Sequence, residues 1–102
     1  RSNSGGISVG DGGTIEDSVA TLSAGTGISS TAFSQIRGCT AHGSGSVGIS
    51  GGSRSLVVSC TAVGNFKGIL ATSSLIQGCI ALSNSNAQID GFSNTLVDNK
   101  TT

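Results

Sequence analysis

The most reactive side chains are those of three cysteines, which recur at nearly equal intervals as Cys39, Cys60 and Cys79. Three thiols in one register could bind a soft metal ion or pair as a disulfide. A zinc site usually adds a fourth ligand, and the only histidine, His42, is expected to point outward. Parallel thiols on stacked strands have a poor torsion for a disulfide. We therefore expect no metal and no cofactor, and three buried free thiols that pack as small apolar groups.

Carboxylates are the second group that could do chemistry, because polysaccharide cleavage uses paired acids, or a calcium ion with a cation facing the substrate. The acidic residues are confined to the first and last parts of the chain: Asp11, Glu16, Asp17, Asp90 and Asp98. The only aromatic residues, which could otherwise stack on sugar rings, are Phe33, Phe66 and Phe92. A Ser-His-Asp triad is uninformative here, because serine is abundant and the histidine is single. We predict no catalytic residue and no enzyme activity.

Composition indicates a small folded protein rather than a linker. The chain has 102 residues, of which 35% are hydrophobic, with 17 glycines and no proline. This hydrophobic content is too high for a disordered segment, so we expect one folded domain over residues 1–102. The formal net charge is zero, which argues against nucleic acid or an anionic membrane surface as a partner. No apolar run approaches the ~18 residues of a membrane-spanning helix, so we also expect no membrane insertion.

A repeat of about twenty residues organises the chain. An isoleucine column is followed, seven or eight residues later, by a second aliphatic column, then by a cysteine column and an alanine column. The four columns are Ile7, Ile28, Ile49, Ile69 and Ile89; Ile15, Ile36, Val57, Ile76 and Val97; Ser18, Cys39, Cys60 and Cys79; and Ala20, Ala41, Ala62 and Ala81. We predict that these columns form a core in five coils, over residues 6–26, 27–47, 48–67, 68–87 and 88–102.

The spacing within each unit predicts short strands, because the apolar residues lie two apart and serine and glycine separate them. Coils stacked about 4.8 Å apart would let each strand hydrogen-bond to its equivalent in the next coil. The sequence therefore predicts an all-β parallel solenoid. In the fifth coil, Lys100 and Thr102 are expected in the cysteine and alanine columns, and with Asp98 and Asn99 they predict a polar C-terminal stop.

One pattern occurs twice in full: Gly-Ile, then Val or Ile, then Cys-x-Ala, then Asn. Its two copies are Gly48, Ile49, Val57, Cys60, Ala62 and Asn65, and Gly68, Ile69, Ile76, Cys79, Ala81 and Asn84. Over about residues 6–99 this pattern resembles the right-handed parallel β-helix repeats of the pectin-lyase-like superfamily. The resemblance implies a right-handed β-helix with 19–21 residues per coil. It implies no single activity, because lyases, hydrolases, epimerases, phage tail proteins and adhesins share such coils. The compartment is left open, with a lean by fold analogy to an extracellular or cell-surface location.

Two further columns are expected to support the coils. Each residue of the first lies three residues after the alanine position: Ser23, Ser44, Asn65 and Asn84. Stacked amides can hydrogen-bond each other and the turn backbone, so we predict a structural ladder and no ligand site. The second column precedes the isoleucines and consists of Gly27, Gly48 and Gly68. There we expect either a positive φ or a close neighbouring coil. Glu16 and Arg37 occupy equivalent positions and should form an exposed ion pair.

A leucine column, Leu56, Leu75 and Leu96, lies just before the second core column. Strict alternation turns these leucines outward beside Val63 and Leu82, whereas a corner in the coil would turn them inward. An exposed apolar stripe of this kind predicts association with copies of the chain or with neighbouring domains.

These observations predict a non-catalytic structural or interaction module that self-associates, alone or within a longer surface or assembly protein. The alternative is a carbohydrate-binding or polysaccharide-processing β-helix with an incomplete active groove, for which carbohydrate would be the partner.

Overall fold

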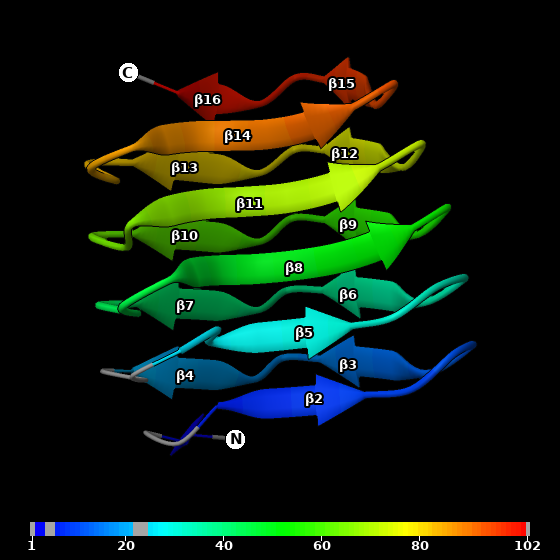
Figure 1. Ribbon diagram of the computed structural model, residues 1–102, viewed down its shortest axis with the longest axis horizontal. Helices are drawn as coiled ribbons and strands as arrows, with labels where there is room; N and C mark the ends of the chain where they lie inside the picture. The colour runs from blue at the N-terminus through cyan, green and yellow to red at the C-terminus, as the bar shows by residue number, and fades with distance from the viewer. Residues whose placement is uncertain (1, 4–5, 22–24, 102) are drawn as a thin grey trace.

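The computed structural model describes residues 2–3, 6–21 and 25–101, and in them the strands form three parallel sheets (Figure 1). Sheet A contains β1 (Ser2–Asn3), β4 (Val19–Thr21), β7 (Thr40–His42), β10 (Thr61–Val63), β13 (Ile80–Leu82) and β16 (Lys100–Thr101). Sheet B contains β2 (Ile7–Val9), β5 (Ile28–Ser30), β8 (Val47–Ser53), β11 (Lys67–Thr72) and β14 (Ala87–Phe92). Sheet C contains β3 (Thr14–Glu16), β6 (Gln35–Arg37), β9 (Leu56–Val58), β12 (Leu75–Gln77) and β15 (Thr95–Val97).

Each strand pairs with its equivalent one turn later. In sheet B, for example, Ile49 lies between Ile28 and Ile69, and in sheet A Ala62 lies between Ala41 and Ala81. The chain passes through sheets B, C and A in turn and then rises to the next coil (Figure 1). The fold is therefore a β-solenoid of about five turns with about 20 residues per turn, which confirms the predicted fold class.

Left-handed backbone marks the corners of the coil. Between sheets C and A, one residue per coil has a φ of 48° to 62°: Asp17, Gly38, Ser59, Gly78 and Asp98. Between sheets B and C, the equivalent residues are Gly12, Phe33, Arg54, Ser73 and Ser93. A side chain in this region costs about 1–2 kcal/mol, which glycine avoids. The Ser- and Gly-rich segments between the strands therefore serve the corners.

Glycine in place of Ser59 is expected to raise the free energy of unfolding by about 0.5 kcal/mol, because glycine adopts a φ of 54° without strain. The reciprocal change, Gly78→Ser, should lower it by about 1 kcal/mol. A Cβ at Gly78 would meet only the Ser59 hydroxyl oxygen, at 3.8 Å, so the loss would reflect φ alone. Urea denaturation measures both changes. A Ser59→Gly chain less stable than the native chain would contradict this account of the corner.

Stacked aliphatic and small side chains fill the interior. The fully buried ones are Ile28, Ile49 and Ile69 in sheet B; Ile36, Val57 and Ile76 in sheet C; and Ala20, Ala41, Ala62 and Ala81 in sheet A, with Cys39, Cys60 and Cys79 at the corner before sheet A. Each large side chain buried in this way contributes about 1.5–3 kcal/mol. Ile89 is only partly buried against this core, because β14 is the last strand of sheet B in the described part.

The register of the last coil differs from the sequence prediction by one residue. Ile76 pairs with Leu96, so Leu96 and not Val97 continues the second core column. Val97 pairs with Gln77 and faces away from the interior. The step from β12 to β15 is one residue shorter than predicted, and adjacent leucine and valine residues made either register plausible from the sequence.

The same shift changes three other assignments. Leu96 does not belong to the leucine column, because Leu75 pairs with Thr95. Thr101 pairs with Ala81 in the alanine column, whereas Thr102 lies outside the described residues. Asn99 precedes β16 at the cysteine position, and its side chain bonds to the backbone of Cys79, so Lys100 does not occupy that column.

Candidate functional site

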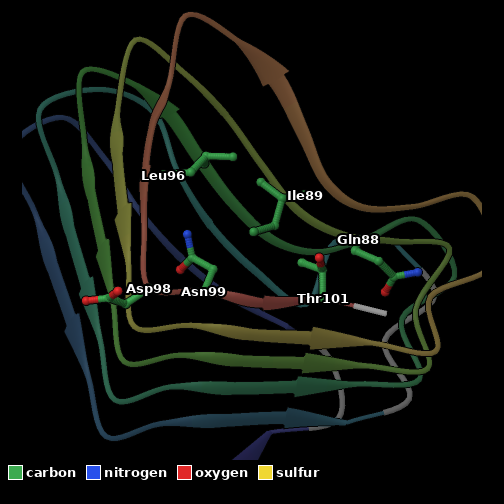
Figure 2. A pocket seen from close by; sticks show the side chains of 6 residues that line it. All are labelled: Gln88, Ile89, Leu96, Asp98, Asn99 and Thr101. Atoms are coloured by element: carbon green, nitrogen blue, oxygen red, sulfur yellow. The ribbon is translucent and has the colours of Figure 1, made fainter.

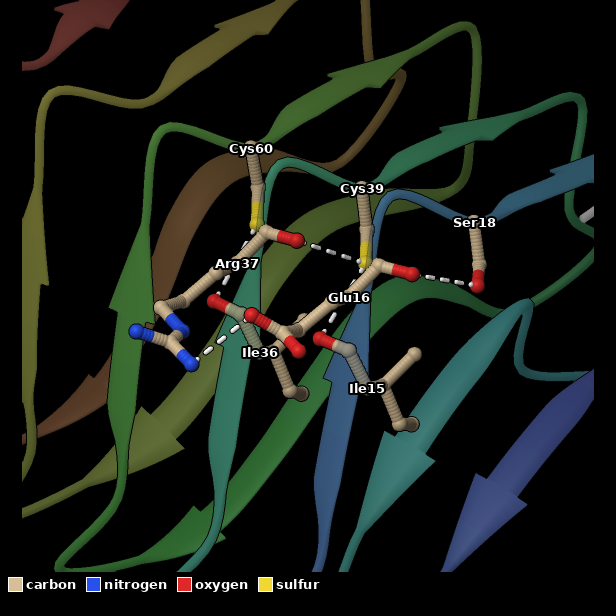
Figure 3. Close-up of polar contacts among 7 residues, drawn as sticks. All are labelled: Ile15, Glu16, Ser18, Ile36, Arg37, Cys39 and Cys60. Atoms are coloured by element: carbon tan, nitrogen blue, oxygen red, sulfur yellow. Dashed lines mark hydrogen bonds and ion pairs between the residues drawn. The ribbon is translucent and has the colours of Figure 1, made fainter.

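Two ion pairs join charged side chains of neighbouring coils. Arg37 Nη2 donates to Glu16 Oε2 at 2.8 Å on the exposed face of sheet C, which confirms the expected pair (Figure 3). Lys67 Nζ lies 2.9 Å from Asp90 Oδ2 on sheet B. Lys67 and the backbone N–H of Gly91 hold the pKa of Asp90 below its usual value. Among the described residues, no group of three or more His, Cys, Asp or Glu is placed to hold a metal ion.

The cysteines lie just before successive strands of sheet A and are buried free thiols. Figure 3 shows Ser18, Cys39 and Cys60 side by side on successive coils. Each thiol donates back to the carbonyl two residues earlier; for Cys60 this is Val58 O, at 3.2 Å. The flanking thiols of Cys39 and Cys79, together with burial, raise the pKa of the Cys60 thiol. Burial suits Cys60 to packing as a small apolar group.

The structure shows which way Leu56 and Leu75 face. Leu56 and Leu75 pair with each other on β9 and β12, and each precedes a buried core residue. They therefore point outward, and with Val58 they form what we call the sheet C patch. A second outward group on β10 and β13, the sheet A patch, contains Val63, Ile80 and Leu82.

The two patches differ in exposure. Ile80 is 39% exposed, whereas the other patch residues are half-buried. Leu96 was predicted to lie beside Leu56 and Leu75. It lies instead at the C-terminal end of the solenoid interior and is 55% exposed. The outward residues predicted as one stripe therefore form two short patches on separate sheets.

Two buried amides form a ladder at the corner between sheets A and B. Asn65 Oδ1 accepts from the Ser44 N–H at 2.8 Å, and Asn65 Nδ2 donates to Ala41 O and to Asn84 Oδ1, both at 3.1 Å. Asn84 repeats the pattern one coil later, with Nδ2 donating to Ala62 O. The predicted hydrogen bonds between amides are thus present, while Ser23, predicted at the start of the ladder, lies outside the described residues.

Close approach explains the glycine column at this corner. Gly27, Gly48 and Gly68 do not have positive φ, so backbone conformation is not the reason for glycine. A Cβ at Gly48 would lie 2.9 Å from Gly68 O in the coil above and 2.5 Å from Asn65 Nδ2. At Gly68 it would overlap the carbonyl oxygen of Gln88. Of the two alternatives, the close neighbouring coil is correct.

The C-terminal end of the solenoid holds an open cavity of about 430 Å³ (Figure 2). The apolar residues Ile89 and Leu96 extend the core columns into it, and polar residues complete its lining: Gln88, Asp98, Asn99 and Thr101. Gln88 is not among the site residues predicted from the sequence. The sequence does mark this residue, because Gln88 interrupts a column that is otherwise glycine.

The described residues contain no helix long and apolar enough to cross a membrane.

Comparison with known proteins identifies the family of the chain. No curated protein matches the sequence. A family model described as a right handed beta helix region matches residues 1–102, which is the whole chain. The chain therefore belongs to the right-handed β-helix family.

Proposed function

We propose that this chain is a non-catalytic structural or interaction module that associates with copies of itself through its outward sheet faces. The observation that carries the proposal is the sheet C patch, where Leu56, Val58 and Leu75 adjoin on two neighbouring strands. Apolar side chains grouped in this way are typical of surfaces that bind another protein. A flat β-sheet face offers the same patch on each copy, which suits a symmetric contact.

The size of the solenoid supports association. The chain measures 29 × 27 × 19 Å, and its core consists of aliphatic and small side chains. Domains this small bury a limited share of their surface and are marginally stable alone. Burying the patches between copies would add to that stability.

The alternative, a polysaccharide-processing or carbohydrate-binding β-helix, receives less support. Glu16 is paired with Arg37 on the first two coils, and Asp90 is paired with Lys67 on the last two. These pairs lie on different sheets, so they do not present two carboxylates to one substrate.

Size-exclusion chromatography with light scattering tests the proposal. The native chain should elute as an oligomer whose mass falls on dilution, and Leu75→Lys should shift it to monomer at the same concentration, because a buried ammonium group is costly to desolvate. Ser8→Lys is the matched control, since Ser8 is exposed on sheet B and gains the same charge. A native chain that stays monomeric at all concentrations would refute self-association.

A further inference from the structure

One residue interrupts the glycine column at the C-terminal end. Gln88 lies opposite Gly68, because Lys67 pairs with Ala87 and Ile69 pairs with Ile89. The described coils below it carry Gly6, Gly27, Gly48 and Gly68 at this position. The last coil is thus the first in this column to bear a Cβ.

Glycine is required at these positions because the backbone of the next coil lies too close for a Cβ. A Cβ at Gly27 would lie 2.8 Å from Gly48 O, and one at Gly48 would lie 2.9 Å from Gly68 O. Carbon and oxygen atoms in van der Waals contact are more than 3 Å apart, so neither position accepts a side chain while the next coil is in register. Gln88 has a Cβ, so a sixth coil in the same register would place its own backbone carbonyl against that atom.

The amide of Gln88 also occupies the place of the next asparagine. Asn84 Oδ1 accepts from the backbone N–H and the Nδ2 of Asn65, at 2.9 and 3.1 Å. Gln88 Oε1 accepts from the same two groups of Asn84, at 3.2 and 2.8 Å, and Nε2 donates to Asn84 O at 3.0 Å. The ladder therefore ends on a side chain from the last coil itself, with no donor of Asn84 left for a further coil.

Side-chain amides also hydrogen-bond the last coil to the coil below at the other two corners. Asn94 Oδ1 accepts from the Ser74 N–H at 3.0 Å, and Asn94 Nδ2 donates to Ala71 O at 2.9 Å. Asn99 Oδ1 accepts from the Cys79 N–H, and Asn99 Nδ2 donates to Ile76 O, both at 2.9 Å. These bonds hold the fifth coil to the fourth and reduce its need for a coil above.

We propose that Gln88 closes the C-terminal end of the solenoid against a sixth coil in the same register, whether that coil belongs to this chain or to a second copy. An open solenoid end presents unpaired strand edges and an apolar bore, which invite end-to-end stacking. Closure at Gln88 leaves the sides of the solenoid available for contacts and disfavours growth along its axis. This inference is independent of self-association through the patches.

A six-coil chain tests the closure directly. Residues 1–99 joined to a second copy of residues 80–102 continue the register, because Lys100 pairs with Ile80 in the native chain. This places the first Gln88 beneath a sixth coil. The comparison is the same chain with Gln88→Gly at that first copy only, and the readout is amide hydrogen exchange of the sixth coil. The five-coil Gln88→Gly chain reports any effect of the substitution on the coils below.

The sixth coil should exchange at least ~100-fold more slowly in the Gln88→Gly chain than in an unfolded peptide, and within ~10-fold of the peptide in the chain that keeps Gln88. Equal protection of the sixth coil in both chains would overturn the proposal. An unprotected sixth coil in both chains would also overturn it, because something other than Gln88 would then close the end.

Discussion

Alanine at position 68 is expected to lower the free energy of unfolding by about 3 kcal/mol. The new Cβ would overlap the carbonyl oxygen of Gln88 and lie 2.6 Å from Asn84 Nδ2. Relief requires the fourth and fifth coils to separate or the Asn84 amide to rotate away from Ala62 O. Either movement breaks buried hydrogen bonds, so the cost exceeds that of a simple crowding contact. Urea denaturation followed by far-ultraviolet circular dichroism measures it.

Gly10→Ala is the control for this substitution. No atom lies within 4 Å of a Cβ built at Gly10, and its φ is not positive. Its effect should stay within about 0.5 kcal/mol, as for most exposed substitutions. If Gly68→Ala were equally mild, the coils would be able to separate freely, and the argument that glycine is required beneath each coil would be wrong.

The fold was predictable because each repeated position of the sequence meets one structural requirement. Ile49 and Val57 must be aliphatic because they stack on copies of themselves, and Ala62 must be small because it faces the same narrow interior. Side chains in such a solenoid see the same environment in every coil, so the sequence repeats with the structure. A single chain therefore carries much of the information that an alignment normally supplies.

The last coil was harder to predict, because in the described part of the chain it has a neighbouring coil on one side only. Leu96 and Val97 both suit an interior position by residue type, and the repeat alone did not decide between them. Gln88 looked like an irregularity in a glycine column, and its meaning depends on the distance between coils, which spacing along the sequence does not give. The corner conformations were also hidden, since Phe33 and Arg54 adopt left-handed backbone that their types do not favour.

The second large effect is expected at Asn65, where alanine should lower the free energy of unfolding by about 3–5 kcal/mol. Asn65 is 2% exposed and is the acceptor for the Ser44 N–H. Its removal also leaves Ala41 O and one lone pair of Asn84 Oδ1 without the bonds that Nδ2 supplies. Each buried polar group left unpaired costs about 1–3 kcal/mol, and the small core has little stability to spare.

Asn86→Ala is the matched control, because Asn86 is an exposed asparagine near the same corner. It should leave the urea midpoint almost unchanged, whereas Asn65→Ala should shift it strongly and speed amide exchange in β7 and β10 together. Coupled loss in both strands is the signature of a ladder, since Asn65 binds the backbone of the coil below and the amide of the coil above. A loss smaller than about 1 kcal/mol would mean that water replaces the amide at this corner. The ladder would then be a consequence of coil stacking and not a cause of it.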